Sequence, residues 1–238
     1  MRILFILLMA AQACFGVASV VQSVSCTEAT GPNTTCVMPG SVTAGNFLVV
    51  FTGHPGGDEC STLLATYSDT QGSVFTGNRS DGQNPSGGQS NSCIITAPIT
   101  SSGADTIVRA RTSSNYPVAM WVVEMTGMAT IAFPSASGGT ADSGTTVNSG
   151  NVTSAAANLL LVCAASDNNG NVFNSASPSG STTAFVAYHG GFLYKFVSPG
   201  TYSCTFNKSA GGTRFSAAAL LISYTSASMV PRHRVVIQ

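Results

Sequence analysis

Short runs of β-branched, aromatic and aliphatic residues recur along almost the whole chain, and each run ends in Gly, Pro, Asn, Asp or Ser. Runs bounded in this way predict β-strands. The clearest of them occupy residues 47–51, 106–108, 118–125, 159–163, 183–188, 192–197 and 215–224. Because no stretch combines a 3.6-residue apolar period with helix caps at both ends, we expect an all-β protein.

The chain carries unusually little charge. Only 8% of its 238 residues are charged, and nine basic side chains balance nine acidic ones. A surface that binds nucleic acid needs a basic stripe, so we expect no nucleic-acid partner. The low charge does not indicate disorder, because 44% of the residues are hydrophobic.

Residues 1–18 have the features of an export signal. Arg2 is followed by a short apolar run and then by small residues that favour cleavage after Ala18. The apolar run is shorter than the roughly 20 residues of a membrane-spanning helix, so we expect no transmembrane segment in the mature chain. The prediction is a secreted, extracellular protein that starts near Ser19. A lipoprotein anchored at Cys14 is the alternative.

The six cysteines that follow the signal are even in number, which in an exported protein predicts disulfides. Pairing between cysteines close in sequence costs the least loop-closure entropy. We therefore expect the disulfides in sequence order, which gives Cys26–Cys36, Cys60–Cys93 and Cys163–Cys204. The chain has no Cys-x-x-Cys spacing and only three His, so we expect no metal site.

The two halves of the chain echo each other. The segment AGNFLVV at residues 44–50 resembles AANLLLV at residues 156–162, and each half closes on a long apolar strand. This approximate duplication fits either two sandwiches or one sandwich built from two similar halves. We favour one domain with a shared core, because the segment between the halves is neither Pro-rich nor charged enough to be a spacer.

The expected organisation follows from this echo. It consists of a β-sandwich at residues 19–225, with halves at about 19–133 and 151–225, a Ser/Thr/Gly-rich connection at 134–150 and a tail at 226–238.

Several short segments of the sequence resemble segments of known proteins. They are AGNFLVV at residues 44–50, SDTQGSVF at 68–75, EMTG at 124–127, TSAAANLLL at 153–161 and GTYSCTF at 200–206. In these segments the chain resembles a loosely defined group of secreted bacterial sandwich domains. The resemblance implies a jelly-roll or Ig-like antiparallel β-sandwich for residues 20–224. It implies no activity, because the group has no agreed catalytic residues.

Glu124 interrupts an otherwise apolar strand. A half-buried carboxylate of this kind can act as an acid, but Arg109 and Arg111 lie two residues apart and therefore share one face of the preceding strand. We expect a structural cross-strand ion pair between Glu124 and these arginines. The chain has no Gly-x-Ser-x-Gly and its few His are scattered, so we expect neither a catalytic triad nor an enzyme.

Phe192, Tyr194 and Phe196 alternate along one strand and so point to the same side. Such an aromatic face could stack on sugar rings, or it could belong to the core.

Two classes of function remain. The first is a secreted, non-catalytic surface-binding or adhesion module without a cofactor, with a polysaccharide or cell-surface ligand as its partner. The alternative is a self-assembling subunit of an extracellular filament, coat or matrix. Charged side chains normally keep edge strands from pairing with other molecules, and this chain has few of them. In that alternative, residues 20–24 could be a strand donated to a neighbouring molecule.

Overall fold

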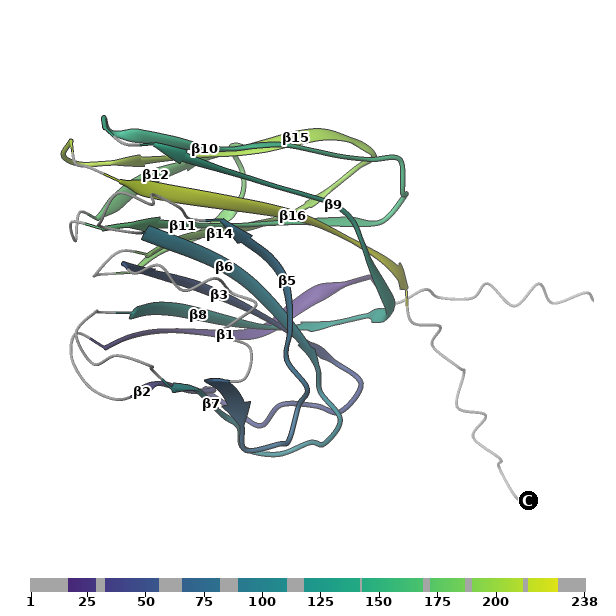
Figure 1. The fold of residues 1–238 in the computed structure, drawn as a ribbon. Helices are drawn as coiled ribbons and strands as arrows, with labels where there is room; N and C mark the ends of the chain where they lie inside the picture. The colour runs from purple at the N-terminus through teal and green to yellow at the C-terminus, as the bar shows by residue number, and fades with distance from the viewer. Residues whose placement is uncertain are drawn as a thin grey trace, which may run out of the picture.

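The protein is described by a computed structural model that covers residues 17–28, 33–55, 66–81, 90–110, 118–141, 143–168, 172–186, 190–211 and 214–226. Within these ranges the chain forms sixteen strands, β1 to β16, and no helix. The strands make four antiparallel sheets that lie one above another as layers (Figure 1). The all-β sandwich class predicted from the sequence is therefore confirmed.

The first half forms a five-stranded and a three-stranded sheet. The larger sheet has the order β1 (Ser19–Glu28), β8 (Val118–Thr126), β3 (Phe47–Pro55), β6 (Ser90–Pro98) and β5 (Thr76–Asp81). The smaller sheet has the order β2 (Asn33–Val37), β7 (Thr106–Ala110) and β4 (Tyr67–Asp69). Early and late strands interleave, and consecutive strands often cross from one sheet to the other, as in a jelly roll.

The second half repeats this order. Its larger sheet contains β9 (Met128–Ala141), β16 (Phe215–Ser226), β11 (Leu159–Asp167), β14 (Gly190–Val197) and β13 (Thr182–Val186). Its smaller sheet contains β10 (Thr146–Ser154), β15 (Gly200–Lys208) and β12 (Phe173–Ser177). Each strand of the first half thus corresponds to the strand eight places later, and the two similar halves predicted from the sequence are present.

The boundary between the halves differs from the predicted one. Gly127 alone separates β8 from β9, and residues 134–141 and 146–150, expected as a connection, belong to strands β9 and β10. Their small side chains suggested a loop, but they serve close packing instead. A Cβ atom at Gly139 would collide with the backbone oxygen of Asn148 on the neighbouring strand.

Apolar side chains fill three layers between the four sheets. One layer lies inside each half, and the third lies between the two five-stranded sheets. The third layer, which we call the central layer, includes Phe51 of β3 and Val162 of β11. Because both faces of a strand such as β11 are covered, all of its residues are buried and its sequence is almost continuously apolar.

The two halves pack in a two-fold manner. The middle strand β3 lies against its own counterpart β11, while β5 lies near β9 and β1 lies near β13. Since β9 corresponds to β1 and β13 to β5, the two edge contacts are equivalent. The same arrangement is found in symmetric dimers, where one patch of each subunit meets the same patch of the other.

Disulfides join the two sheets within each half. Cys26 on β1 is bonded to Cys36 on β2, and Cys163 on β11 is bonded to Cys204 on β15. These are the pairs that the sequence order predicted. Cys93 is also disulfide-bonded, and its predicted partner Cys60 lies outside the described residues.

The described residues include no helix that could cross a membrane. Most of the predicted export signal, Cys14 included, and the tail from residue 227 onward lie outside them. Ala18, the last residue of that signal, is only 4% exposed, and it packs in the central layer.

Candidate functional site

Glu124 lies fully buried at the rim of the first half, where its carboxylate accepts three hydrogen bonds. The backbone nitrogen of Thr43 (3.0 Å) and the side-chain amide of Asn46 (2.6 Å) donate to Oε1. The side-chain amide of Gln22 donates to Oε2 at 2.6 Å. Glu124 therefore ties β8 to β1 and to the turn that precedes β3, which is a structural role.

The predicted ion pair between Glu124 and Arg109 is not formed. Arg109 lies on β7, which pairs with β2 and β4, whereas β8 pairs with β1 and β3. Its guanidinium carbon instead lies 6.0 Å from the centre of the Tyr67 ring. Sequence reasoning treated β7 and β8 as neighbours, but the jelly-roll order puts consecutive strands into different sheets. Arg111 lies outside the described residues.

The three aromatic residues of β14 mostly belong to the central layer. Phe192 is fully buried, with its ring 5.8 Å from that of Phe51. Tyr194 stacks on Trp121 at 5.5 Å. Only Phe196 is substantially exposed, and its ring meets that of Tyr224 edge to face at 6.3 Å. Phe192 is therefore unavailable to a ligand, and the accessible part of this aromatic row is its end at Phe196.

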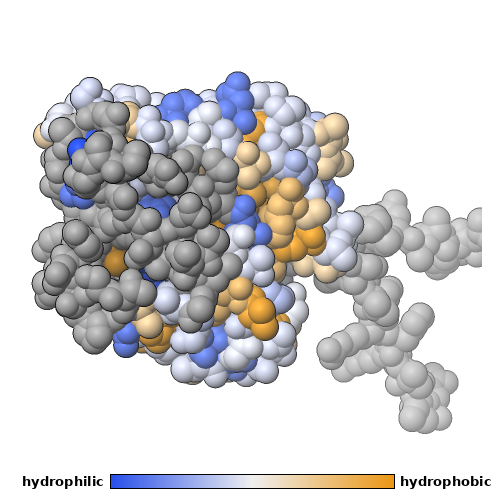
Figure 2. Space-filling model, viewed as in Figure 1, coloured by the Kyte–Doolittle hydropathy of each residue, from blue (hydrophilic) through white to orange (hydrophobic). Residues whose placement is uncertain are grey.

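A cleft lies beside Tyr224, where the central layer opens to solvent. We call it the junction cleft. Its volume is about 330 Å³, and it is lined by Thr130, Ile131, Ala132, Ala156, Ala157, Asn158, Ser223, Tyr224 and Thr225. A second hollow of about 240 Å³ shares Thr130 and Ile131 with it and continues toward the first half. Figure 2 shows hydrophobic residues gathered on the right-hand side of the body, near β9.

Among the residues that the structure describes, none that lines the junction cleft is charged. Thr130 and Thr225 share a hydrogen bond of 2.6 Å, and the side-chain amide of Asn158 donates to the backbone oxygen of Tyr224 at 3.3 Å. The phenol of Tyr224 is neutral at physiological pH, and partial burial raises its pKa further above the ordinary value of 10.0. An aromatic ring beside hydroxyl and amide groups suits a neutral, polar ligand such as a sugar.

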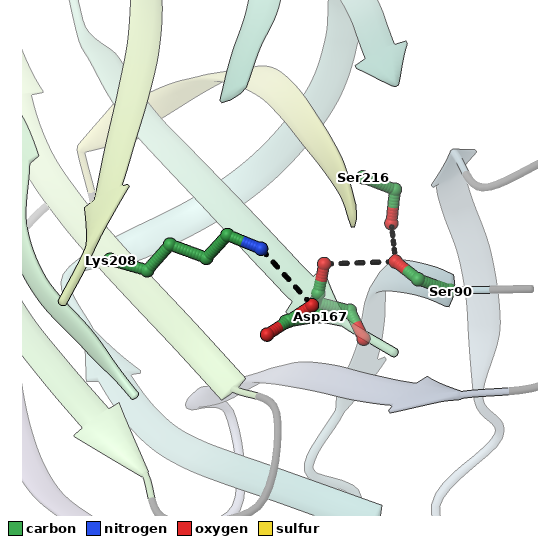
Figure 3. A network of polar contacts seen from close by, with 5 residues as sticks. Ser90, Asp167, Lys208 and Ser216 are labelled. Atoms are coloured by element: carbon green, nitrogen blue, oxygen red, sulfur yellow. Dashed lines mark hydrogen bonds and ion pairs between the residues drawn. The ribbon is translucent and has the colours of Figure 1, made fainter. Parts of the chain in front are cut away.

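A buried polar network lies where the two halves meet near β6 (Figure 3). Lys208 and Asp167 form an ion pair of 3.2 Å between fully buried side chains. Beside them, the Ser90 hydroxyl donates to the backbone oxygen of Ser166 (2.8 Å) and shares a hydrogen bond of 3.0 Å with the Ser216 hydroxyl. The serine hydrogen bonds hold β6 of one half to β11 and β16 of the other, whereas the ion pair joins β15 to β11 inside the second half. We assign both a structural role.

Sequence analysis missed the Lys208–Asp167 pair, although the alternation of side chains along a strand could have revealed it. Lys208 is two residues from the buried Phe206 on β15, and Asp167 is four residues from Cys163 on β11, so each shares a strand face with that core residue. Both charged residues therefore point into the core of the second half.

Uncharged polar side chains cover the outer face of the three-stranded sheet of the second half. Neighbouring strands are linked there by side-chain hydrogen bonds, including Thr153–Thr201, Asn148–Thr205 and Thr146–Asn207, each at 2.8 Å. These bonds occupy many of the polar groups, so the junction cleft remains the better candidate for a ligand.

No protein-family model, no curated protein and no solved structure matches this chain. The resemblance to secreted bacterial sandwich domains therefore stays a prediction.

Proposed function

We propose that this protein is a secreted, non-catalytic binding module that attaches to a neutral polysaccharide or another cell-surface glycan through the junction cleft. The observation that carries the proposal is the lining of that cleft, whose described residues combine the Tyr224 ring with hydroxyl and amide groups and carry no charge. Sugars offer an apolar ring face and many hydroxyls, so they match such a surface.

Two further features support the proposal. Disulfides are typical of exported proteins, and this chain has them in both halves. Glu124, the carboxylate most suspected of catalysis, already accepts hydrogen bonds from Gln22, Thr43 and Asn46, which suits a structural anion better than a general acid.

The proposal is tested by measuring binding to insoluble polysaccharides and to a glycan array. Removing the ring with Tyr224→Ala should weaken binding about tenfold, because an aromatic contact contributes roughly 0.5–1.5 kcal/mol beyond its buried area. The matched control is Tyr202→Ala on β15, a tyrosine that does not line the cleft, and this variant should bind like the wild type if it folds. Equal binding by wild type and Tyr224→Ala would contradict the assignment of the cleft, and release of reducing ends from a bound glycan would contradict a non-catalytic role.

The alternative role is a self-assembling structural subunit, and the edge strands favour it. Edge strand β9 is fourteen residues long and contains no charged residue, and β13 at the opposite edge is also uncharged. Uncharged edges can pair with those of another molecule. Residues 20–24 are not free for donation in this conformation, because they pair with β8 of the same chain. Regular polymers in negatively stained samples would favour this alternative over glycan binding.

A further inference from the structure

Three side-chain oxygen atoms at the rim of the first half are shielded from solvent and have no hydrogen-bond partner. They are Asp69 Oδ2, Ser73 Oγ and Asp105 Oδ2. Asp105 as a whole residue is only 2% exposed. A buried polar atom left unpaired destabilises the folded protein, and an unpaired charged atom does so more strongly. Such atoms therefore indicate a partner that the polypeptide itself does not provide.

The three atoms belong to one place in the fold. The second carboxylate oxygen of Asp69 accepts a hydrogen bond from the backbone nitrogen of Ser73 at 2.8 Å. The second carboxylate oxygen of Asp105 accepts from the backbone nitrogen (3.2 Å) and the hydroxyl (3.1 Å) of Thr70, the residue next to Asp69. Each carboxylate thus uses one oxygen to hold the turn after β4 and keeps the other oxygen unpaired.

Without a bound cation, the electrostatics around the Asp69 and Asp105 carboxylates are unfavourable. Asp105 is buried, and the negative charge of Asp69 lies close enough to act on it. Arg109 is the nearest basic residue along the strand, but its guanidinium lies over the Tyr67 ring, and its buried Nε and Nη1 atoms pair with neither carboxylate. A positive charge placed between the two carboxylates would relieve both the repulsion and the missing hydrogen bonds.

We propose that Asp69, Ser73 and Asp105 form a binding site for a divalent cation with oxygen ligands, and that this cation is Ca²⁺. Calcium is bound by carboxylate, hydroxyl, carbonyl and water oxygens, usually six to eight of them. Transition metals prefer His and Cys ligands. The side chains at this place offer oxygen alone, from two carboxylates and one hydroxyl. Backbone carbonyls and water would complete the coordination.

The second half of the chain offers an internal comparison. Ser177 ends β12 as Asp69 ends β4, and each is followed three residues later by a glycine with positive φ, 71° at Gly72 and 73° at Gly180. The turn is therefore repeated without its carboxylate. In the described part of the second half no buried side-chain oxygen or nitrogen lacks a partner. Unpaired oxygens are therefore found where the turn has acidic residues, and none is found at the similar turn that lacks them.

A calcium ion here would fasten the turn after β4 to the start of β7. It would stabilise the first half, and its binding is independent of the proposed attachment to glycans. The readout can therefore be stability and direct ion binding, with no need for a glycan ligand.

The test uses the full chain after treatment with a chelator. Calcium is titrated by calorimetry, and thermal unfolding is compared in EDTA, in 10 mM Ca²⁺ and in 10 mM Mg²⁺. We expect Ca²⁺ to raise Tm by about 3–10 °C, if its affinity is that of other extracellular calcium modules, and Mg²⁺ to have a smaller effect. Luminescence of Tb³⁺ excited through Tyr67 gives a second readout that needs no variant.

The variants Asp69→Asn and Asp105→Asn keep the shape of the side chains and remove their charges. Each should weaken Ca²⁺ binding at least tenfold and abolish the rise in Tm, whereas Ser177→Ala in the second half should leave the rise unchanged. A wild-type protein whose Tm does not respond to Ca²⁺ and that binds no Tb³⁺ would overturn the proposal. A response that persists in the double variant of Asp69 and Asp105 would overturn it as well.

Discussion

Replacing Glu124 by Gln tests whether its buried carboxylate is a structural anchor. The variant keeps one oxygen for Thr43 and Asn46 but puts an NH₂ group where Gln22 donates. Two donors then face each other, unless Gln22 turns and gives up its bond from the backbone nitrogen of Gly40. We expect Glu124→Gln to lower the free energy of unfolding by about 1–3 kcal/mol, as measured by urea denaturation.

The control for this prediction is Ser25→Ala on the exposed side of β1, which should change the stability by less than about 0.5 kcal/mol. Unfolding of Glu124→Gln at the same urea concentration as the wild type would show that the carboxylate is not needed as an acceptor.

Tyr67 makes the stability depend on alkaline pH. Burial raises its pKa above 10.0, although the positive charge of Arg109 and the hydrogen bond with Thr52 act in the opposite direction. The unfolded chain then loses this proton at a lower pH than the folded chain does, so the free energy of unfolding falls as the pH rises through about 10. Tyr67→Phe should cost about 0.5–1.5 kcal/mol at neutral pH, through loss of the Thr52 bond.

The difference in stability between wild type and Tyr67→Phe should therefore shrink between about pH 9 and pH 11. Urea unfolding at several pH values measures it, and comparing the two proteins cancels the ionisation of the other tyrosines and lysines. A difference that stays constant with pH would mean that Tyr67 ionises alike in the folded and unfolded chains.

At the scale of single elements, the strands could be predicted from the sequence but their partners could not. The apolar run at β8 indicated a strand, and the turn residues around it indicated its ends. Which strand lies beside it depends on contacts between residues far apart in the chain, such as Val49 opposite Val123. The junction cleft was unpredictable for the same reason, because it is assembled from β9, β16 and the turn before β11, none of which carries a motif.

The sequence similarity between the halves does not reveal that the strand faces are shifted by one residue. Phe47 at the start of β3 points into the central layer, whereas the matching Leu159 at the start of β11 points into the core of its own half. A slip of one residue exchanges the two faces of a strand. The preceding turns differ as well. Gly45 has a φ of 88°, but Ala157 is not among the described residues with positive φ, since a Cβ disfavours that region.

The two described disulfides should contribute unequally to stability. Cys26 and Cys36 are 10 residues apart, and Cys163 and Cys204 are 41 residues apart. Constraint of the unfolded chain grows with loop length and predicts roughly 3 kcal/mol for the first bond and roughly 4 kcal/mol for the second. Replacing each pair by two alanines and measuring urea unfolding tests the order. A larger loss from the Cys26–Cys36 pair would show that native packing outweighs the loop effect.

At the scale of the whole molecule, the central layer makes the two halves dependent on each other. Each half has its own apolar interior, yet each also exposes one face of a five-stranded sheet to its partner. Gly190 shows how closely these faces approach, because a Cβ there would overlap the side chain of Ala119 on the other half. A half expressed alone would expose this apolar face to water, and large exposed apolar patches promote association.

Trp121 allows this dependence to be measured. It is the single tryptophan of the chain, and its ring lies 5.2 Å from Phe51 of its own half and 5.5 Å from Tyr194 of the other half. Its emission therefore reports whether the halves are docked, while far-UV circular dichroism reports the strands of both. Because separating the halves would expose the central layer, we expect the two signals to change together in one urea transition.

Phe51→Ala should lower the free energy of unfolding by about 3–5 kcal/mol and so move that whole transition to lower urea concentration. The reason is that the Phe51 ring also lies 5.8 Å from Phe192 of the other half. A change in Trp121 emission at lower urea than the loss of strand signal would mean that the halves undock while still folded, and the central layer would then be an interface between two independent domains.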